Sequence, residues 1–154
     1  MTDHVSPEDD RLAVVAATGA ADPSPVVMLN LNRYHERARY PEGTTDVDTD
    51  VSGREAYLRY GAVAYPAILS VGGDILWAAD AAEVVIGCDH DRYDEVVAVW
   101  YPSREAFLKL AEYPGYMEAH VHREAAIEQS ALIATRGDAE PRLVSPFAAP
   151  GGAR

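Results

Sequence analysis

The sequence predicts an α+β fold in which one helix precedes a β-α-β-β-α-β order of elements. The 154 residues are 48% hydrophobic, which is sufficient for a single globular domain with a core. β-branched runs alternate with capped amphipathic segments, and turns rich in Pro and Gly separate them. We expect residues 1–24 to form the N-terminal helix and a linker, residues 25–136 the folded domain, and residues 137–154 a disordered tail.

The N-terminal segment predicts a short helix followed by the first strand. Ser6 is a suitable N-cap and Pro7 suits the first helical position. We expect the helix to end at Gly19. Residues 26–33 (VVMLNLNR) have the β-branched start and the length of a strand.

A long polar segment and a second helix follow this strand. Residues 34–51 have few apolar anchors by sequence, and we interpret them as a mobile lid. Ser52 and Glu55 match the capping-box pattern S-x-x-E, and apolar residues then recur at spacings of three and four. We expect this helix to kink at Pro66 and to end before the two glycines at 72–73.

The second half of the chain predicts a β-hairpin, two helical segments and a final strand. Turn residues join the two strands of the hairpin, and a Pro-Ser pair caps the first helical segment. The expected ranges are residues 74–87 and 93–100 for the hairpin, a helix after 102–103, a helix over 116–128, and a strand over 130–134. This order is the split βαβ arrangement of ferredoxin-like folds.

Alternation along the first strand gives it one apolar face and one mixed face. The apolar face carries Val27, Leu29 and Leu31, and the mixed face carries Met28, Asn30 and Asn32. We expect the two helices to cover the apolar face. The mixed face would then line a partly polar cavity that a second subunit closes, so we expect a homodimer.

Composition excludes several classes of partner. A formal net charge of −12 without a basic face argues against nucleic acid. No stretch approaches the roughly 20 apolar residues of a membrane helix, and the acidic N-terminus does not resemble a secretory signal. The single cysteine, Cys88, has acidic neighbours and cannot form an internal disulfide. We therefore expect a cytoplasmic protein that binds neither membranes nor nucleic acid.

Several short segments, in order along residues 26–134, carry a family resemblance. They are VVMLNL (26–31), SGREAY (52–57), VGG (71–73), YD (93–94), YPSR (101–104), YPGY (113–116) and HREAA (122–126). With these segments the chain resembles the uncharacterised domain of unknown function 1330 family of the dimeric α/β-barrel superfamily. The resemblance implies a ferredoxin-like unit that pairs into a dimeric barrel, and it implies no general reaction. Tyr93 replaces an expected tryptophan and Asn32 an expected apolar residue, which suggests a more polar pocket.

Three residues are candidates for acid/base or anion-binding roles. His35 follows the first strand, where an imidazole could act on a bound ligand; the alternative is a solvated histidine beside Glu36. His120 and Arg123 share a helical face with Tyr116. Arg123 would hold a carboxylate or an enolate, or it would pair with a nearby glutamate instead.

A larger set of residues would bind the ligand. Aromatic rings offer flat surfaces and hydroxyl donors, and amides and guanidinium groups offer hydrogen bonds. The expected ligand-binding residues are Asn30, Asn32, Arg33, Tyr57, Tyr60, Trp77, Trp100 and Tyr116. The alternative is that the aromatic residues belong to the core or to a dimer interface.

No metal or cofactor motif is present in the sequence. Asp46, Asp48 and Asp50 resemble the start of a calcium loop, but Val51 stands where that loop needs glycine and Tyr57 where it needs glutamate. His120 and His122 lie on different helical faces without a further metal ligand, and no nucleotide, dinucleotide or serine-hydrolase motif occurs. We expect no cofactor; haem, which the superfamily resemblance allows, is left open.

Two functions remain as hypotheses. The first is a cofactor-independent enzyme that uses acid/base chemistry, as a cyclase, isomerase or monooxygenase does, on an aromatic or polyketide-like metabolite. Its base would be His35, and Asn30, Asn32 and Arg123 would orient or stabilise an enolate. The second is a homodimer that binds a ligand without catalysis or has only a structural role.

Overall fold

Four antiparallel strands form one sheet in the order β2-β3-β1-β4. The strands are β1 (Val26–Tyr34), β2 (Asp74–Asp80), β3 (Glu95–Tyr101) and β4 (Ile127–Ala134). The computed structural model describes residues 6–135. The tail predicted for residues 137–154 therefore lies outside the described part of the chain.

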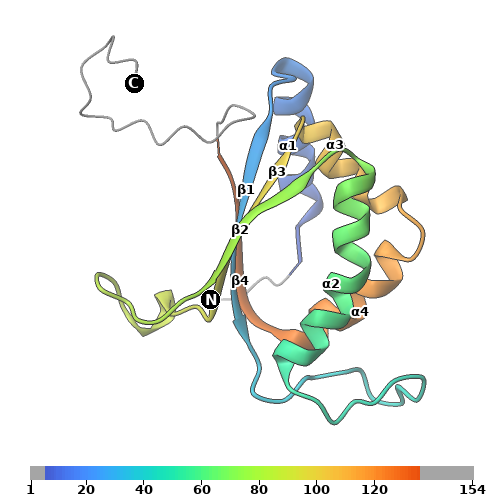
Figure 1. Cartoon of the computed structure of the whole chain (residues 1–154), viewed down its shortest axis with the longest axis vertical. Helices are drawn as coiled ribbons and strands as arrows, with labels where there is room; N and C mark the ends of the chain where they lie inside the picture. Colours follow the sequence, from blue (N-terminus) through green and yellow to red (C-terminus); the bar gives the residue numbers. More distant parts are fainter. Residues whose placement is uncertain (1–5, 136–154) are drawn as a thin grey trace.

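Helices α2 (Gly53–Ser70) and α4 (Tyr116–Ala126) cover one face of this sheet (Figure 1). The remaining helical elements are α1 (Asp9–Ala21), α3 (Arg104–Leu108) and the short 3₁₀ helices η1 (Asp89–Asp91) and η2 (Lys109–Glu112). The α+β class and the β-α-β-β-α-β order are confirmed, as is the additional N-terminal helix. None of the helices within residues 6–135 combines the length and apolarity that a membrane span requires.

Helix α1 begins and ends later than the sequence predicts. Its N-cap is Glu8 rather than Ser6, whose hydroxyl donates instead to Oε1 of Glu124 at 3.2 Å. Gly19 does not end the helix. A Cβ at this position would lie 3.0 Å from the Cβ of Arg104, so the glycine allows α1 to approach α3 closely.

The predicted capping box at the start of α2 is confirmed. The Ser52 hydroxyl accepts from the Glu55 backbone N–H at 3.2 Å, and the Glu55 carboxylate accepts from the Ser52 N–H at 2.8 Å. Gly53 follows because a Cβ there would lie 2.4 Å from the carbonyl oxygen of His35. The helix contains Pro66 and ends at Ser70; the predicted end before the two glycines is confirmed.

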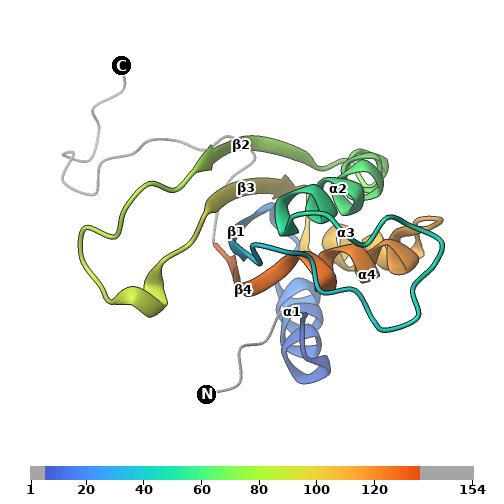
Figure 2. The ribbon, with the colours of Figure 1, turned by 90° about the horizontal axis from the view of Figure 1, so that it is seen from below.

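The β2–β3 hairpin has a longer connection than the sequence predicts. Strand β2 ends at Asp80 rather than at Gly87, and residues 81–94, here called the arm, project beyond the sheet (Figure 2). Val85 and Ile86 are almost fully exposed on the arm. At the other end of the domain, α4 ends at Ala126 and β4 already begins at Ile127, so the predicted helix to residue 128 was too long.

The face of β1 that packs against the helices is the mixed one, so the expectation that the helices cover its apolar face is wrong. Met28 is buried in the core with Ala67 and Ile68 of α2. The Asn32 side-chain amide, also buried, donates to the Tyr57 hydroxyl on α2 at 3.1 Å. This bond satisfies a polar group that would otherwise be costly to bury.

The other face of the sheet, here called the open sheet face, is mainly apolar, and the registers place Arg33, Gln129 and Asp74 on it as polar members. The strand registers place on it Val27, Leu29 and Leu31 of β1, Val96, Ala98 and Trp100 of β3, Trp77 and Ala79 of β2, and Ala131 and Ile133 of β4. Trp77 is 49% exposed and Ile133 is 50% exposed. Helices α2 and α4 lie on the opposite side (Figure 2).

The segment between β1 and α2 is anchored to the domain. Ala38, Tyr40 and Val51 pack against a small buried cluster that includes Ala126 and Ile127. Backbone bonds from Arg39 N to Ala125 O at 2.8 Å and from His35 N to Ala126 O at 2.9 Å reinforce the attachment. The expectation that this segment has few apolar anchors is therefore wrong.

Candidate functional site

A cavity of about 250 Å³ lies between the sheet and helices α2 and α4. We call it the inner cavity. Its polar lining comes from Asn30 on β1, Tyr57 and Tyr60 on α2, and Tyr116, His120 and Arg123 on α4, and its remaining walls are mainly apolar. The apolar wall includes Met28, Val97 and Val99 of the sheet. The mixed face of β1 thus lines a cavity, as predicted, but this cavity lies on the side of the sheet that the helices cover.

Three tyrosine hydroxyls are held in place at this cavity. The hydroxyls of Tyr60 and Tyr116 lie 3.0 Å apart, so one donates to the other. The Tyr57 oxygen accepts from the Asn32 amide at 3.1 Å. Since Tyr57 makes no other hydrogen bond among residues 6–135, its own O–H proton is available to a ligand.

Burial keeps these hydroxyls protonated. It raises the pKa of Tyr57 to about 12, and it also raises the pKa values of Tyr60 and Tyr116 above their ordinary value. A protonated phenol can donate a hydrogen bond, whereas a phenolate cannot. Tyr57 and one member of the Tyr60–Tyr116 pair therefore have an O–H proton to donate to a ligand at neutral pH.

His120 is in its neutral form at neutral pH. Burial lowers the pKa of its imidazole, and the positive charge of Arg123 lowers it further. Nε2 of His120 is buried and has no hydrogen-bond partner within residues 6–135. The ring packs edge-on against Tyr60 and Tyr116, at centroid distances of 5.6 Å and 5.0 Å. A neutral imidazole in this position can accept a proton from a ligand.

Arg123 places a positive charge at the cavity wall. Its side chain is 8% exposed, and Nη2 lies 3.5 Å from the Ser130 hydroxyl of β4. Glu95 also lines the cavity, and its carboxylate accepts from the Tyr34 hydroxyl and lies 3.5 Å from Nη1 of Arg54. A positive charge at a cavity wall attracts an oxygen that is anionic or becomes anionic.

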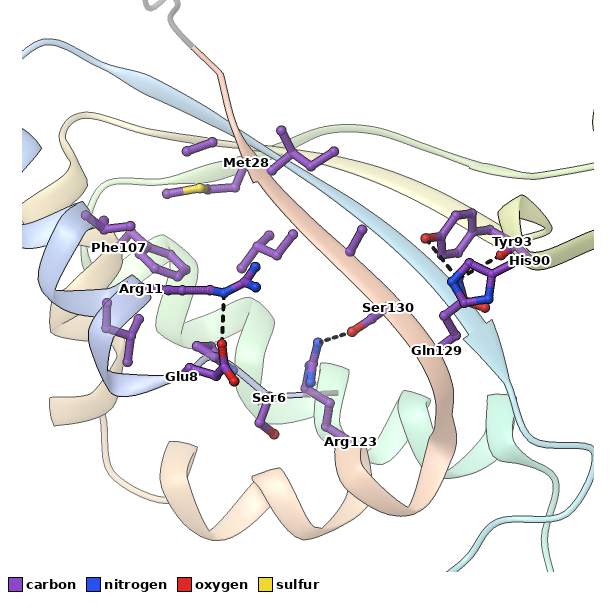
Figure 3. A pocket seen from close by; sticks show the side chains of 17 residues that line it. Ser6, Glu8, Arg11, Met28, His90, Tyr93, Phe107, Arg123, Gln129 and Ser130 are labelled. Carbon is purple, nitrogen blue, oxygen red and sulfur yellow. Dashed lines mark hydrogen bonds and ion pairs between the residues drawn. The ribbon is translucent and has the colours of Figure 1, made fainter. Parts of the chain in front are cut away.

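A larger groove of about 610 Å³ runs along the edge of the sheet between α1 and β4 (Figure 3). We call it the outer groove. Leu12 and Val15 of α1 and Leu132 of β4 form part of its apolar wall. At its polar end the Gln129 amide donates to the His90 carbonyl oxygen at 2.8 Å and to the Tyr93 hydroxyl at 3.2 Å.

The structure separates the predicted site residues into two groups. Asn30, Tyr57, Tyr60, Tyr116, His120 and Arg123 line the inner cavity. The other predicted residues do not line it. Asn32 bonds to the Tyr57 hydroxyl, and Arg33 pairs with Glu128 at 3.0 Å. Trp77 and Trp100 lie on the open sheet face, and His35 lies in the segment after β1. The inverted faces of β1 account for much of this separation.

His35 is held through its backbone. Its N–H donates to Ala126 O at 2.9 Å, and its carbonyl oxygen accepts from Gly53 N at 3.0 Å. These bonds join the end of β1 to the start of α2 and the end of α4. Of the histidines within residues 6–135, His120 is the one that lines the inner cavity.

Sequence reasoning missed Glu95 at the cavity. Its position pairs with Asn32 across β1 and β3. The alternation along β3 places Glu95 on the same face as Val97 and Val99. It points to the cavity only once it is known which face of β1 the helices cover. Within residues 6–135, no three His, Cys, Asp or Glu side chains are grouped so that they could hold a metal ion.

Comparisons with known proteins give a family and two similar structures. A family model described as "Domain of unknown function (DUF1330)" matches residues 47–136. The crystal structure of RPA0582, a protein of unknown function from Rhodopseudomonas palustris, shares 34% identity over 88% of this chain and 98% of that one, with a TM-score of 0.74. The crystal structure of methylated RPA0582 shares 33% identity over 96% and 100% of the two chains, with a TM-score of 0.76. No curated protein matches this chain.

Proposed function

The chain belongs to the DUF1330 family of domains of unknown function, and we propose that its inner cavity binds a small planar molecule and moves a proton on it. Family membership supplies no activity, so the cavity itself must support the proposal. The observation that carries it is the meeting of His120, Arg123 and three tyrosine hydroxyls at one cavity. A cavity with convergent polar groups and a titratable group of shifted pKa is a candidate reaction site.

The proposed reaction is an enolisation. The neutral imidazole of His120 takes a proton from a carbon next to a carbonyl group, so that the C–H bond breaks and an N–H bond forms. The electron pair of that C–H bond moves onto the carbonyl oxygen, which becomes an enolate. Hydroxyl protons of the tyrosines and the charge of Arg123 stabilise this oxygen. The proton then returns to the same or to another atom, which gives isomerisation or allows cyclisation.

The ligand class follows from the lining. The tyrosine rings, five among the lining residues, and the apolar side chains of the sheet favour a flat, unsaturated molecule, as in an aromatic or polyketide-like metabolite. The donors favour a carbonyl or carboxylate oxygen on it. The residues that carry out the step are all side chains of this chain, so no cofactor is needed for the proposed proton transfer.

Proton exchange tests the proposal without knowledge of the natural substrate. The probe is 1-phenyl-1,3-butanedione in deuterated buffer, and proton NMR follows the loss of its C2 protons. The protein should accelerate this loss, and His120→Gln should reduce the acceleration by about 100-fold, in the range of general base catalysis. The matched control is His122→Gln, since His122 lies on the same helix but bonds to Tyr40 instead of lining the cavity.

Two outcomes would contradict the enzymatic proposal. The first is exchange no faster with the protein than with buffer alone. The second is acceleration that His120→Gln leaves unchanged. Binding without accelerated exchange would favour a ligand-binding function instead.

A homodimer is the second proposal, and the open sheet face supports it. Its apolar side chains, including the half-exposed Trp77 and Ile133, are costly to leave in water. The arm adds a hollow of about 360 Å³, which Leu31 and Val96 of the open sheet face also line. Two copies of this face would cover each other in a closed pair, which is how the dimeric barrel expected from the sequence would form. A homodimer without catalysis is the alternative function.

A further inference from the structure

The inner cavity and the outer groove share one wall. Both are lined by Pro7, Met28, Phe107, Arg123 and Leu132. We infer that one ligand occupies both, as an amphipathic molecule with a compact unsaturated head, an anionic or enolisable centre and an alkyl tail. The inference rests on the proposed function of the inner cavity and extends it to the substrate class.

The two volumes indicate why the inner cavity holds only part of the ligand. Pockets for ligands of drug size measure about 300–1,000 Å³. The inner cavity, at about 250 Å³, falls below this range, whereas the outer groove, at about 610 Å³, falls within it. A ring with one or two substituents would therefore occupy the inner cavity, and a longer substituent would extend past the shared wall into the groove.

The position of Arg123 indicates how the head, the anionic centre and the tail of the ligand follow one another. Its buried side chain belongs to the shared wall and bonds to Ser130 on β4, which lines the groove. An anionic oxygen near Arg123 would thus lie between the head and the tail. Figure 3 shows Arg123 and Ser130 between the α1 end of the groove, with Phe107, and the end with His90 and Gln129.

The groove wall next to α1 suits an alkyl chain. Leu12, Val15 and Phe107 are only half-buried there, so an apolar tail would cover surface that now contacts water. Ala131, Leu132 and Ile133 continue the apolar wall along β4. Glu8 and Arg11 also line this part of the groove, where their side chains form an ion pair at 2.9 Å.

A series of 2-phenylalkanoic acids tests the inference by calorimetric titration of the full chain. In these molecules the carboxylate stands between the phenyl ring and the alkyl chain. Phenylacetate, 2-phenylbutanoate and 2-phenyloctanoate should bind with increasing affinity, by about twofold to fourfold for each methylene added. Leu12→Trp should fill the groove, weakening 2-phenyloctanoate at least tenfold while leaving phenylacetate unchanged. The matched control is Val14→Trp, because Val14 is exposed on α1 and does not line the groove.

The outcomes separate this inference from the proposed function. If 2-phenyloctanoate binds no tighter than phenylacetate, or if Leu12→Trp leaves its affinity unchanged, the groove does not hold the tail and the inference is overturned, while the inner cavity remains a binding site. If Val14→Trp weakens the long acid as much as Leu12→Trp does, the tail binds elsewhere on α1 and the inference is equally overturned. If none of the three acids binds, the proposed anion-binding cavity fails and the inference fails with it.

Discussion

The hydroxyl oxygens of Tyr60 on α2 and Tyr116 on α4 lie 3.0 Å apart, and their hydrogen bond joins the two helices that cover the sheet. Tyr60→Phe should lower the free energy of unfolding by about 1 kcal/mol, because it removes this bond and leaves the buried Tyr116 hydroxyl without its partner. Urea denaturation measures the change. Tyr113→Phe is the control, since the Tyr113 hydroxyl makes no hydrogen bond within residues 6–135, and an equal loss in both variants would contradict the prediction.

The order of the elements could be predicted because local chemistry specifies it. Ser52 and Glu55 lie within four consecutive positions, and each side chain bonds to the backbone N–H of the other, so their capping box depends on local sequence alone. Ser103 likewise caps α3 by accepting from Ala106 N at 3.1 Å. The end of α1 could not be predicted, because Gly19 serves a contact with Arg104 that is distant in sequence.

The site could be predicted only in part, because both faces of β1 carry residues suited to burial. Val27, Leu29 and Leu31 suggest a core, yet they face away from the helices. Asn32 suggests a polar cavity, yet its amide is buried against Tyr57. Alternation shows which residues share a face, but not which face the helices cover. The spacing of Tyr116, His120 and Arg123 predicts a shared helix face whichever face of β1 the helices cover, and all three line the cavity.

The charge of Arg123 should be measurable at His120. Arg123→Met should raise the pKa of the His120 imidazole towards its ordinary value, because the arginine is the second largest cause of the lowering, after burial. NMR titration of the ring protons measures this pKa. Arg59→Met is the matched control, since Arg59 lowers the pKa of His122 instead. If the pKa of His120 changes equally with both substitutions, the charge of Arg123 is not what lowers it.

Acid should destabilise the protein partly through His120. The pKa of His120 is lowered in the folded state, so below about pH 6.5 the unfolded chain binds a proton that the folded chain does not. The contribution of His120 to the free energy of unfolding is therefore fully present above pH 6.5 and is lost as the pH falls towards the pKa of His120 in the folded state. Between pH 7.5 and 5.5, the melting temperature of His120→Gln should decrease less than that of the parent. An identical decrease would show that His120 is not buried as a neutral group.

The open sheet face should determine the oligomeric state. Trp77→Glu and Ile133→Glu should convert a dimer into monomers, because each replaces an apolar side chain worth about 1.5–3 kcal/mol of burial with a charge. Light scattering after gel filtration measures the mass. The control is Leu69→Glu on α2, since Leu69 is 48% exposed, against 49% for Trp77 and 50% for Ile133. A monomeric parent, or a Leu69→Glu variant that dissociates equally, would remove the support for pairing through this face.

Tyr40 should hold the tip of the segment between β1 and α2. Its hydroxyl accepts from Nη1 of Arg59 at 3.0 Å and lies 2.9 Å from Nδ1 of His122, which can accept the tyrosine proton. Tyr40→Phe removes both bonds, so it should lower the free energy of unfolding by about 1–2 kcal/mol. It should also speed tryptic cleavage after Arg39, which follows local opening more directly than global unfolding does.

The control for this prediction is Tyr65→Phe, since Tyr65 is a half-exposed tyrosine on α2 whose hydroxyl makes no hydrogen bond within residues 6–135. Mass spectrometry of timed digests identifies the cut. If cleavage after Arg39 is as slow in Tyr40→Phe as in the parent, the backbone bond from Arg39 N to Ala125 O suffices to hold the segment. If the parent itself is cut there as fast as a denatured chain, the contacts of Tyr40 are too weak to anchor it. In that case the segment would be the mobile lid that its polar sequence predicts.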